Sequence, residues 1–345
     1  MDTKIRPRIQ YCRDANGQAA LKVQTKDYVE IKGAGVISGN SLLSFGATDS
    51  TYNYTQITYE TEKDAENEFV LANKNDLHYN IVGEGACVTS MGGNAQRTIQ
   101  VDASNSKIDL SNAMGAQTVY MSTQSHDNKV TLGAGNDNYI DEGKFNHVKD
   151  QGGSNNFTTT NNSHGAVLVG GAGDDTFTIS GSYSIIDGGN GTNVFNMMGI
   201  FGEQEDVSYR NIVIGGSGND TYNDKGGYNI FFAGGGNDTI NLAGSYGIAD
   251  VRENSGENTG TYNSSSIESL IFTGDEQTYN GTTYNIHTIM RNYGWTLNEF
   301  LNIYSQVSVE NPESLATHNV IDSNTMAKIT EYFKNNLSKE KETNK

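Results

Sequence analysis

A nine-residue glycine-rich repeat in the middle of the chain constrains the fold more than any other feature. The two complete copies are Gly170–Thr178 and Gly215–Asn223, which fit the pattern Gly-Gly-x-Gly-x-Asp-x-U-x, where U is a large apolar residue. Less complete copies lie at Leu132–Tyr139, Gly153–Phe157, Gly188–Phe195 and Ala233–Ile240. Such periodicity is typical of a stacked repeat architecture rather than of a disordered glycine-rich segment.

The sixth residues of these copies keep a regular register. They are Asp137, Asn155, Asp175, Asn193, Asp220 and Asp238, separated by steps of 18, 20, 18, 27 and 18 residues. About half-way between them lie Asn128, Asn146, Ser184, Asn211 and Asn229, each followed two residues later by an apolar residue. Each coil of the repeat is therefore expected to contain two short strands, of which only one follows a glycine-rich turn.

The residue types explain how such a coil closes and stacks. Glycines at positions one, two and four allow positive φ and a tight turn. The large residue at position eight should point inward from a strand. One coil cannot bury this residue alone, so successive coils must stack. The residues of the expected internal ladder are Tyr139, Phe157, Phe177, Phe195, Tyr222 and Ile240. The fold predicted is all-β, a right-handed parallel β-roll or β-solenoid.

Stacked turns would also align a column of acidic side chains along one edge. Asp137, Asp175, Asp220 and Asp238 would repel one another unless a cation lies between adjacent turns. Carboxylate and carbonyl oxygens together provide the six to eight ligands that Ca²⁺ prefers, whereas zinc and copper favour histidine or cysteine. The chain has a formal charge of −18, which disfavours binding to nucleic acid and anionic membranes.

Residues 128–250 resemble the RTX (repeats-in-toxin) family of bacterial calcium-binding proteins. The resemblance implies that Ca²⁺ ions lie between successive turns. It also implies that their ligands are the sixth-position side chains and the carbonyls of turn residues. The side chains would be those of Asp137, Asn155, Asp175, Asn193, Asp220 and Asp238, and the carbonyls those of Gly170, Ala172, Gly215 and Ser217. The resemblance further implies type I secretion without a cleaved N-terminal signal, and folding in external calcium.

Three departures from the family pattern affect the expected sites. Only one edge carries the full motif, so three to five ions are expected. Asn155 and Asn193 bring no charge, which predicts weaker neighbouring sites. The step of 27 residues predicts an insertion near Gly202–Asp206.

The flanks divide the chain into further predicted regions. Residues 1–75 are expected to form an N-terminal β region, with strands at Val29–Lys32 and Tyr54–Tyr59 and a turn at Gly33–Gly39. Residues 76–127 are expected to form solenoid coils that need no metal, followed by the calcium-binding roll at 128–260. Residues 261–345 are expected to form a capping strand at 267–272 and helices at 297–304 and 324–337. This last region could serve as a cap or as an export signal.

The remaining patterns bear on location and activity. The family resemblance implies a secreted or cell-surface protein. Neither a cleavable N-terminal signal nor an apolar run of membrane-spanning length is visible, so export would need another signal. No His-Glu-x-x-His or Gly-x-Ser-x-Gly motif is present, and a non-enzyme is favoured. Three hypotheses stay open: an extracellular structural or adhesive protein that binds a surface, matrix or host partner, an accessory part of a secreted toxin or hydrolase, and a solenoid enzyme acting on carbohydrate.

Overall fold

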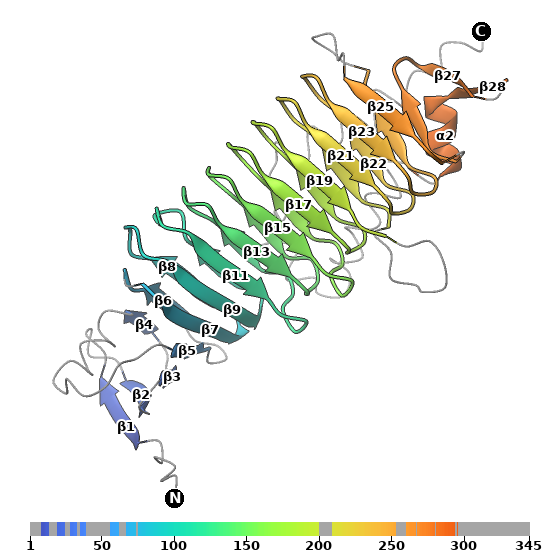
Figure 1. The fold of residues 1–345 in the computed structure, drawn as a ribbon. Helices are drawn as coiled ribbons and strands as arrows, with labels where there is room; N and C mark the ends of the chain where they lie inside the picture. Colours follow the sequence, from blue (N-terminus) through green and yellow to red (C-terminus); the bar gives the residue numbers. More distant parts are fainter. Residues whose placement is uncertain are drawn as a thin grey trace, which may run out of the picture. The chain divides into compact units, whose positions relative to one another are not determined.

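The computed structural model describes most of the chain, in two compact units, 1–156 and 157–345. The residues it describes are 8–13, 19–24, 28–32, 35–38, 56–61, 67–73, 75–199, 209–252, 260–266, 268–279, 281–293 and 295. The predicted fold class is confirmed: in its described residues the chain is mostly a parallel β-solenoid of about 10 turns, with one short helix towards their C-terminal end (Figure 1).

In the first unit the chain alternates between two sheets (Figure 1). One sheet contains, in spatial order, β1 (Arg8–Arg13), β2 (Ala19–Gln24), β3 (Tyr28–Lys32), β5 (Gln56–Glu60), β7 (Leu77–Glu84), β9 (Arg97–Ser104), β11 (Gln117–Met121) and β13 (Asn138–Asp141). The other contains β4 (Gly35–Ser38), β6 (Asn67–Leu71), β8 (Cys87–Ser90), β10 (Lys107–Asp109), β12 (Lys129–Thr131) and β14 (His147–Lys149). Only β1, β2 and β3 pair antiparallel among these strands. The turn predicted at Gly33–Gly39 is wrong, because β4 lies within it.

The second unit repeats the same alternation. One sheet contains β15 (Asn156–Thr159, whose first residue ends the first unit), β17 (Thr176–Ile179), β19 (Val194–Met197), β21 (Thr221–Asp224), β23 (Thr239–Leu242) and β25 (Thr261–Ser264). The other contains β16 (Val167–Val169), β18 (Ile185–Asp187), β20 (Ile212–Ile214), β22 (Ile230–Phe232), β24 (Ile248–Asp250) and β26 (Leu270–Phe272). The hairpin of β27 (Glu276–Tyr279) and β28 (Thr282–Asn285) leads into helix α2 (Ile286–Asn292).

The eighth-position residues form the predicted internal ladder. Phe177 pairs in register with Phe195, Phe195 with Tyr222, and Tyr222 with Ile240, and all four side chains are fully buried. The rings of Phe177 and Phe195 stack with their centroids 5.0 Å apart. Tyr222 stacks instead on Phe231 of the opposite sheet, at 4.4 Å. The stacked rings fill the space between the two sheets.

A second apolar layer on the outside of β16–β26 has no counterpart in the sequence analysis. All three residues of each of these strands are buried, so both faces of this sheet are covered where it is described. Helix α2 contributes Ile286, Ile289 and Met290 to this layer. Its first turn is capped by the side chain of Asn285, which accepts from the backbone N–H of His287 at 3.1 Å.

The C-terminal predictions have mixed outcomes. The strand expected at 267–272 is confirmed in its last three residues as β26, which pairs in parallel with β24, whereas Ile267 lies outside the described residues. The helices expected at 297–304 and 324–337, and the insertion at 202–206, lie outside the described residues. Within the described part, no helix has both the length and the apolar character needed to cross a membrane.

Candidate metal centre

The glycine turns preceding β17, β19, β21 and β23 use their glycines in two ways. The second and fourth positions have positive φ, as at Gly216 (105°) and Gly218 (137°), a region that favours glycine. The first position is glycine before β17, β19 and β21, where it needs space instead, and Ala233 before β23. A Cβ on Gly215 would lie 2.3 Å from the carbonyl oxygen of Ala233 and 2.7 Å from Oδ2 of Asp220. Two oxygens from successive turns therefore converge beside the first glycine.

The same convergence occurs two repeats earlier in the second unit. A Cβ on Gly170 would lie 2.4 Å from Oδ2 of Asp175 and 2.8 Å from the carbonyl oxygen of Gly188. The position next to Gly188 is different, because there the carbonyl of Gly215 faces Nδ2 of Asn193. An amide N–H₂ is a donor and a carboxylate oxygen is not. Asparagine at the sixth position thus places a donor where aspartate places a second acceptor.

The sixth-position side chains are buried and join adjacent coils. Their exposed fractions do not exceed 2% for Asp137, Asn155, Asp175, Asn193, Asp220 and Asp238. In Asn155, Asn193, Asp220 and Asp238, one side-chain oxygen accepts from the backbone N–H of the sixth residue in the preceding coil. These bonds run from Asp137 to Asn155 (2.8 Å), from Asp175 to Asn193 (3.1 Å), from Asn193 to Asp220 (2.8 Å) and from Asp220 to Asp238 (2.8 Å). In Asp220 and Asp238 this bond engages one of the two carboxylate oxygens.

The second oxygen of two of these carboxylates is uncompensated. Within the described residues, Oδ2 of Asp137 and Oδ2 of Asp220 are buried without a hydrogen-bond partner. Burial raises the pKa of Asp137 to about 6. Burial, with a contribution from the charge of Asp238, raises the pKa of Asp220 to about 7. A buried carboxylate in this position requires a proton or a cation.

The turn carbonyls complete the description of the candidate ligands. The predicted carbonyl ligands all lie in the glycine turns, three or five residues before a sixth-position aspartate: Gly170, Ala172, Gly215 and Ser217. The carbonyl of Ser217 accepts from the N–H of Gly191 at 3.0 Å, so one of its two lone pairs is occupied. Among the described residues, no group of three or more histidine, cysteine, aspartate or glutamate side chains could hold a metal ion. A cation here would depend on carbonyls of two turns as much as on carboxylates.

In the first unit the sixth-position register continues upstream with donors instead of acids. Arg97 pairs in register with Gln117, and the N–H of Gln117 donates to Oδ1 of Asp137 at 2.6 Å. The buried guanidinium of Arg97 donates to the carbonyls of Ala72 (2.7 Å) and Met91 (3.2 Å) and to Oε1 of Gln117 (3.1 Å). These side-chain donors satisfy turn oxygens without a metal.

The amide of Gln117 acts in the same way. Its Nε2 donates to the carbonyls of Ala95 at 2.8 Å and Gly115 at 2.6 Å. Our sequence analysis missed both Arg97 and Gln117, although a signal was available. Positions 97, 117 and 137 are separated by steps of 20 residues, which extend the sixth-position series.

The opposite edge contains buried acids of another kind, which the sequence analysis also missed. Asp224 accepts from the N–H of Gly226 (2.8 Å), Nδ2 of Asn229 (2.9 Å) and the hydroxyl of Tyr222 (3.2 Å). Asp141 makes the equivalent three bonds in the first unit. Their signal is a repeated Tyr-x-Asp-x-Gly-x-x-Asn motif, at 139–146 and 222–229. Both acids are satisfied by protein donors and need no cation.

Comparison with known proteins does not assign the chain. No family model, no curated protein and no solved structure matches it.

Proposed function

We propose that this protein is an extracellular calcium-binding repeat protein of the RTX type, in which Ca²⁺ between successive glycine turns completes the solenoid. The observation that carries the proposal is the pair of oxygens beside Gly215. Among the described residues, Oδ2 of Asp220 is buried without a hydrogen-bond partner, and it lies close to the same point as the carbonyl of Ala233 in the next turn. A hard cation with oxygen ligands is the group that such a pair favours.

The contrast with Arg97 and Gln117 supports this assignment. In their coils, side-chain N–H groups satisfy the turn carbonyls directly. In the later coils that have aspartate at this position, the carboxylate is an acceptor and cannot do so. A positive charge supplied from outside would replace the missing donor. The candidate ligands are the carboxylates of Asp137, Asp175, Asp220 and Asp238 with carbonyls of the adjoining turns, and sites beside Asn155 and Asn193 would be weaker.

The proposed role follows from where calcium is available. Extracellular calcium modules bind in the range of about 10⁻⁴ to 10⁻³ M, so coils of this kind would stay loose inside a cell and close outside it. This suits export through type I secretion machinery and a structural or adhesive role at a cell surface, matrix or host partner.

Far-UV circular dichroism during a calcium titration of the chelated protein tests the proposal, with magnesium as the control. We expect a cooperative gain of β signal with calcium and none with magnesium at equal ionic strength. An unchanged spectrum and an unchanged thermal midpoint with calcium would overturn the proposal, because the solenoid would then fold by packing alone.

A further inference from the structure

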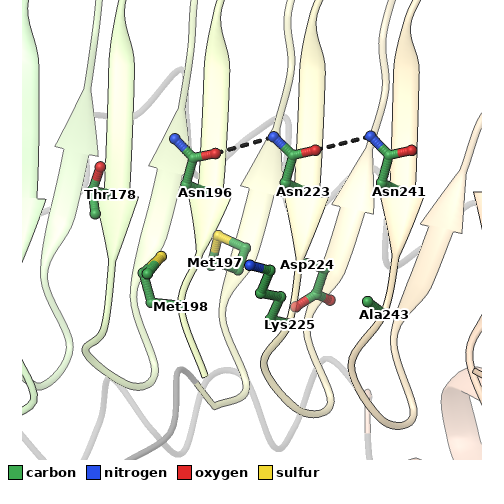
Figure 2. Close-up of a pocket in the computed structure, with 9 residues that line it drawn as sticks. All are labelled: Thr178, Asn196, Met197, Met198, Asn223, Asp224, Lys225, Asn241 and Ala243. Carbon is green, nitrogen blue, oxygen red and sulfur yellow. Dashed lines mark hydrogen bonds between the residues drawn. The ribbon is translucent and has the colours of Figure 1, made fainter. Parts of the chain in front are cut away.

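A row of asparagines crosses the outer face of the sheet that contains β19, β21, β23 and β25 (Figure 2). Asn196, Asn223, Asn241 and Asn263 pair in register on successive strands. Each of the last three donates Nδ2–H to Oδ1 of its predecessor, at 3.0, 2.9 and 3.0 Å. The row is directed to the outside, because the intervening residues of β19, β21 and β23 are the buried ones.

The amides of this row keep hydrogen-bonding capacity for a ligand. An asparagine amide has two N–H donors and two acceptor lone pairs. In Asn223 one donor bonds Asn196 and one lone pair accepts from Asn241. One donor and one acceptor therefore remain on each inner residue of the row. They repeat once per strand, at about 4.8 Å, and carry no net charge.

A shallow pocket of about 360 Å³ lies along this row (Figure 2). Asn196, Asn223 and Asn241 form its polar side. Met198, Lys225 and Ala243, the residues that follow β19, β21 and β23, lie on its other side. Met198 is 42% exposed, which is unusual for a large apolar side chain. The pocket thus offers a periodic polar wall and a partly apolar one.

The charge of this face limits the kinds of ligand that fit. The outward rows of β17–β25 contain Thr, Val, Asn, Ser, Met and Ala, and Lys225 is the one charged residue in them. By contrast, the first unit has two half-buried acids in the corresponding rows: Asp102 at an outward position of β9, and Glu142 directly after β13. Asp224 also lines the pocket, but its carboxylate is buried and accepts from Tyr222, Gly226 and Asn229, so no acid side chain stands at an outward position of these strands. This face can therefore accept a neutral ligand. A strongly anionic ligand would find only one positively charged side chain in these rows, that of Lys225.

We propose that this asparagine pocket binds an extended, neutral polysaccharide lying across the strands. A sugar ring is about as long as one strand spacing, so successive hydroxyl groups can meet successive amides, which sit about 4.8 Å apart. The C–H face of a sugar would pack on Met198 and on the stem of Lys225. This inference is independent of the calcium proposal, since none of the pocket residues is a candidate calcium ligand.

Affinity electrophoresis of the full chain in calcium tests the inference. Native gels contain hydroxyethylcellulose, xyloglucan or mixed-linkage β-glucan as neutral probes and polygalacturonate as the acidic probe. We expect retardation by at least one neutral polysaccharide and a weaker effect of polygalacturonate. Absence of retardation in all three neutral gels, or stronger retardation by polygalacturonate, overturns the inference.

Two variants and a control separate binding from a purely structural ladder. Asn223→Ala removes two ladder bonds and a ligand contact and should weaken binding by about tenfold. Ala243→Trp fills the pocket from an exposed position and leaves the ladder intact, and it should also abolish retardation. Asn138→Ala, at an outward position of β13 in the first unit, is the matched control. Circular dichroism confirms the fold of each variant.

If both pocket variants are retarded as strongly as the wild type, the asparagine row is only structural and the inference is overturned.

Discussion

At the scale of the residue, the fate of a buried carboxylate depends on which atoms face its two oxygens. Asp220 and Asp224 are four residues apart and both are 1% exposed. Asp224 is satisfied by three protein donors, whereas Oδ2 of Asp220 has no hydrogen-bond partner among the described residues. The carboxylate of Asp224 therefore has all its partners within the protein, whereas that of Asp220 needs a proton or a cation in addition.

The matched variants Asp220→Asn and Asp224→Asn test this distinction, because each removes one negative charge. Asp220→Asn keeps the acceptor for the N–H of Asn193 and should leave the chelated protein as stable as the wild type, or more stable, while reducing the stabilisation by calcium. Asp224→Asn should lower stability by about 1–3 kcal/mol with or without calcium, because it weakens charge-assisted bonds. Urea unfolding in chelator and in calcium measures both. Equal effects of the two variants on the calcium response would contradict the ligand assignment.

The raised pKa values predict how the chelated protein responds to pH. The pKa of Asp220 is raised to about 7 and that of Asp137 to about 6, from about 4 in the unfolded chain. Between these values the folded state binds more protons than the unfolded state, so stability falls as pH rises from about 4 to about 7. Burial raises the pKa of Asp141 to about 6 and also raises that of Asp224, which adds to the same fall.

Calcium should oppose this fall, because under the proposed assignment it would bind the ionised carboxylates of Asp137 and Asp220 and not those that protein donors already satisfy. The thermal midpoint in chelator should decrease from pH 5 to pH 8, and the increase caused by calcium should grow over the same range. Thermal melts at four pH values measure both trends. A calcium effect that is the same at every pH would be evidence against carboxylate ligands.

The register of the sixth-position residues could be predicted from the sequence, because it is marked by glycine and aspartate. These residue types have the strongest local requirements in a tight turn. The sequence did not predict that four of these side chains would each accept a hydrogen bond from the backbone N–H of the preceding coil. That bond depends on the stacking register, which one coil does not specify. Arg97 and Gln117 were missed because they share the register of the acids and not their chemistry.

At the scale of the element, the glycine turn has two separable requirements. Gly216 and Gly218 need positive φ, whereas Gly215 needs room for the oxygens of Asp220 and Ala233. Gly235, in the next turn, has open space around the position of a Cβ. Gly215→Ala should therefore cost about 1–3 kcal/mol through overpacking and should reduce the calcium response. Gly235→Ala should change both very little. Thermal melts with and without calcium compare them, and a similar loss in the two variants would contradict the crowding argument.

The strands were predictable because alternation and turn residues are local signals. The eighth-position ladder follows directly from the period, and all its members are buried in the structure. The outer apolar layer was less visible, since strands such as Ile230–Phe232 have only three residues and show no alternation. Helix α2 was missed for a related reason: its seven residues are too few to display a helical period.

At the scale of the whole molecule, the two kinds of coil should respond differently to calcium. Coils that contain Arg97 and Gln117 have their turn oxygens satisfied by side-chain donors. Coils that contain Asp175 and Asp220 bring carboxylate and carbonyl oxygens together. The chain has 41 acidic and 23 basic residues, so its negative charges repel one another throughout, and calcium would also relieve this repulsion.

Hydrogen exchange measured by mass spectrometry resolves the two kinds of coil within one chain. In chelator, the amides of β9 and β11 should exchange slowly, because their coils are complete without a metal, and those of β19, β21 and β23 should exchange quickly. Calcium should slow exchange in β19, β21 and β23 by a large factor and leave exchange in β9 and β11 nearly unchanged.

Sodium chloride at equal ionic strength is the control for general screening of the charge. Slow exchange of β21 and β23 in chelator would mean that their packing is sufficient. Fast exchange of β9 and β11 in chelator would mean that the donors of Arg97 and Gln117 do not replace the cation.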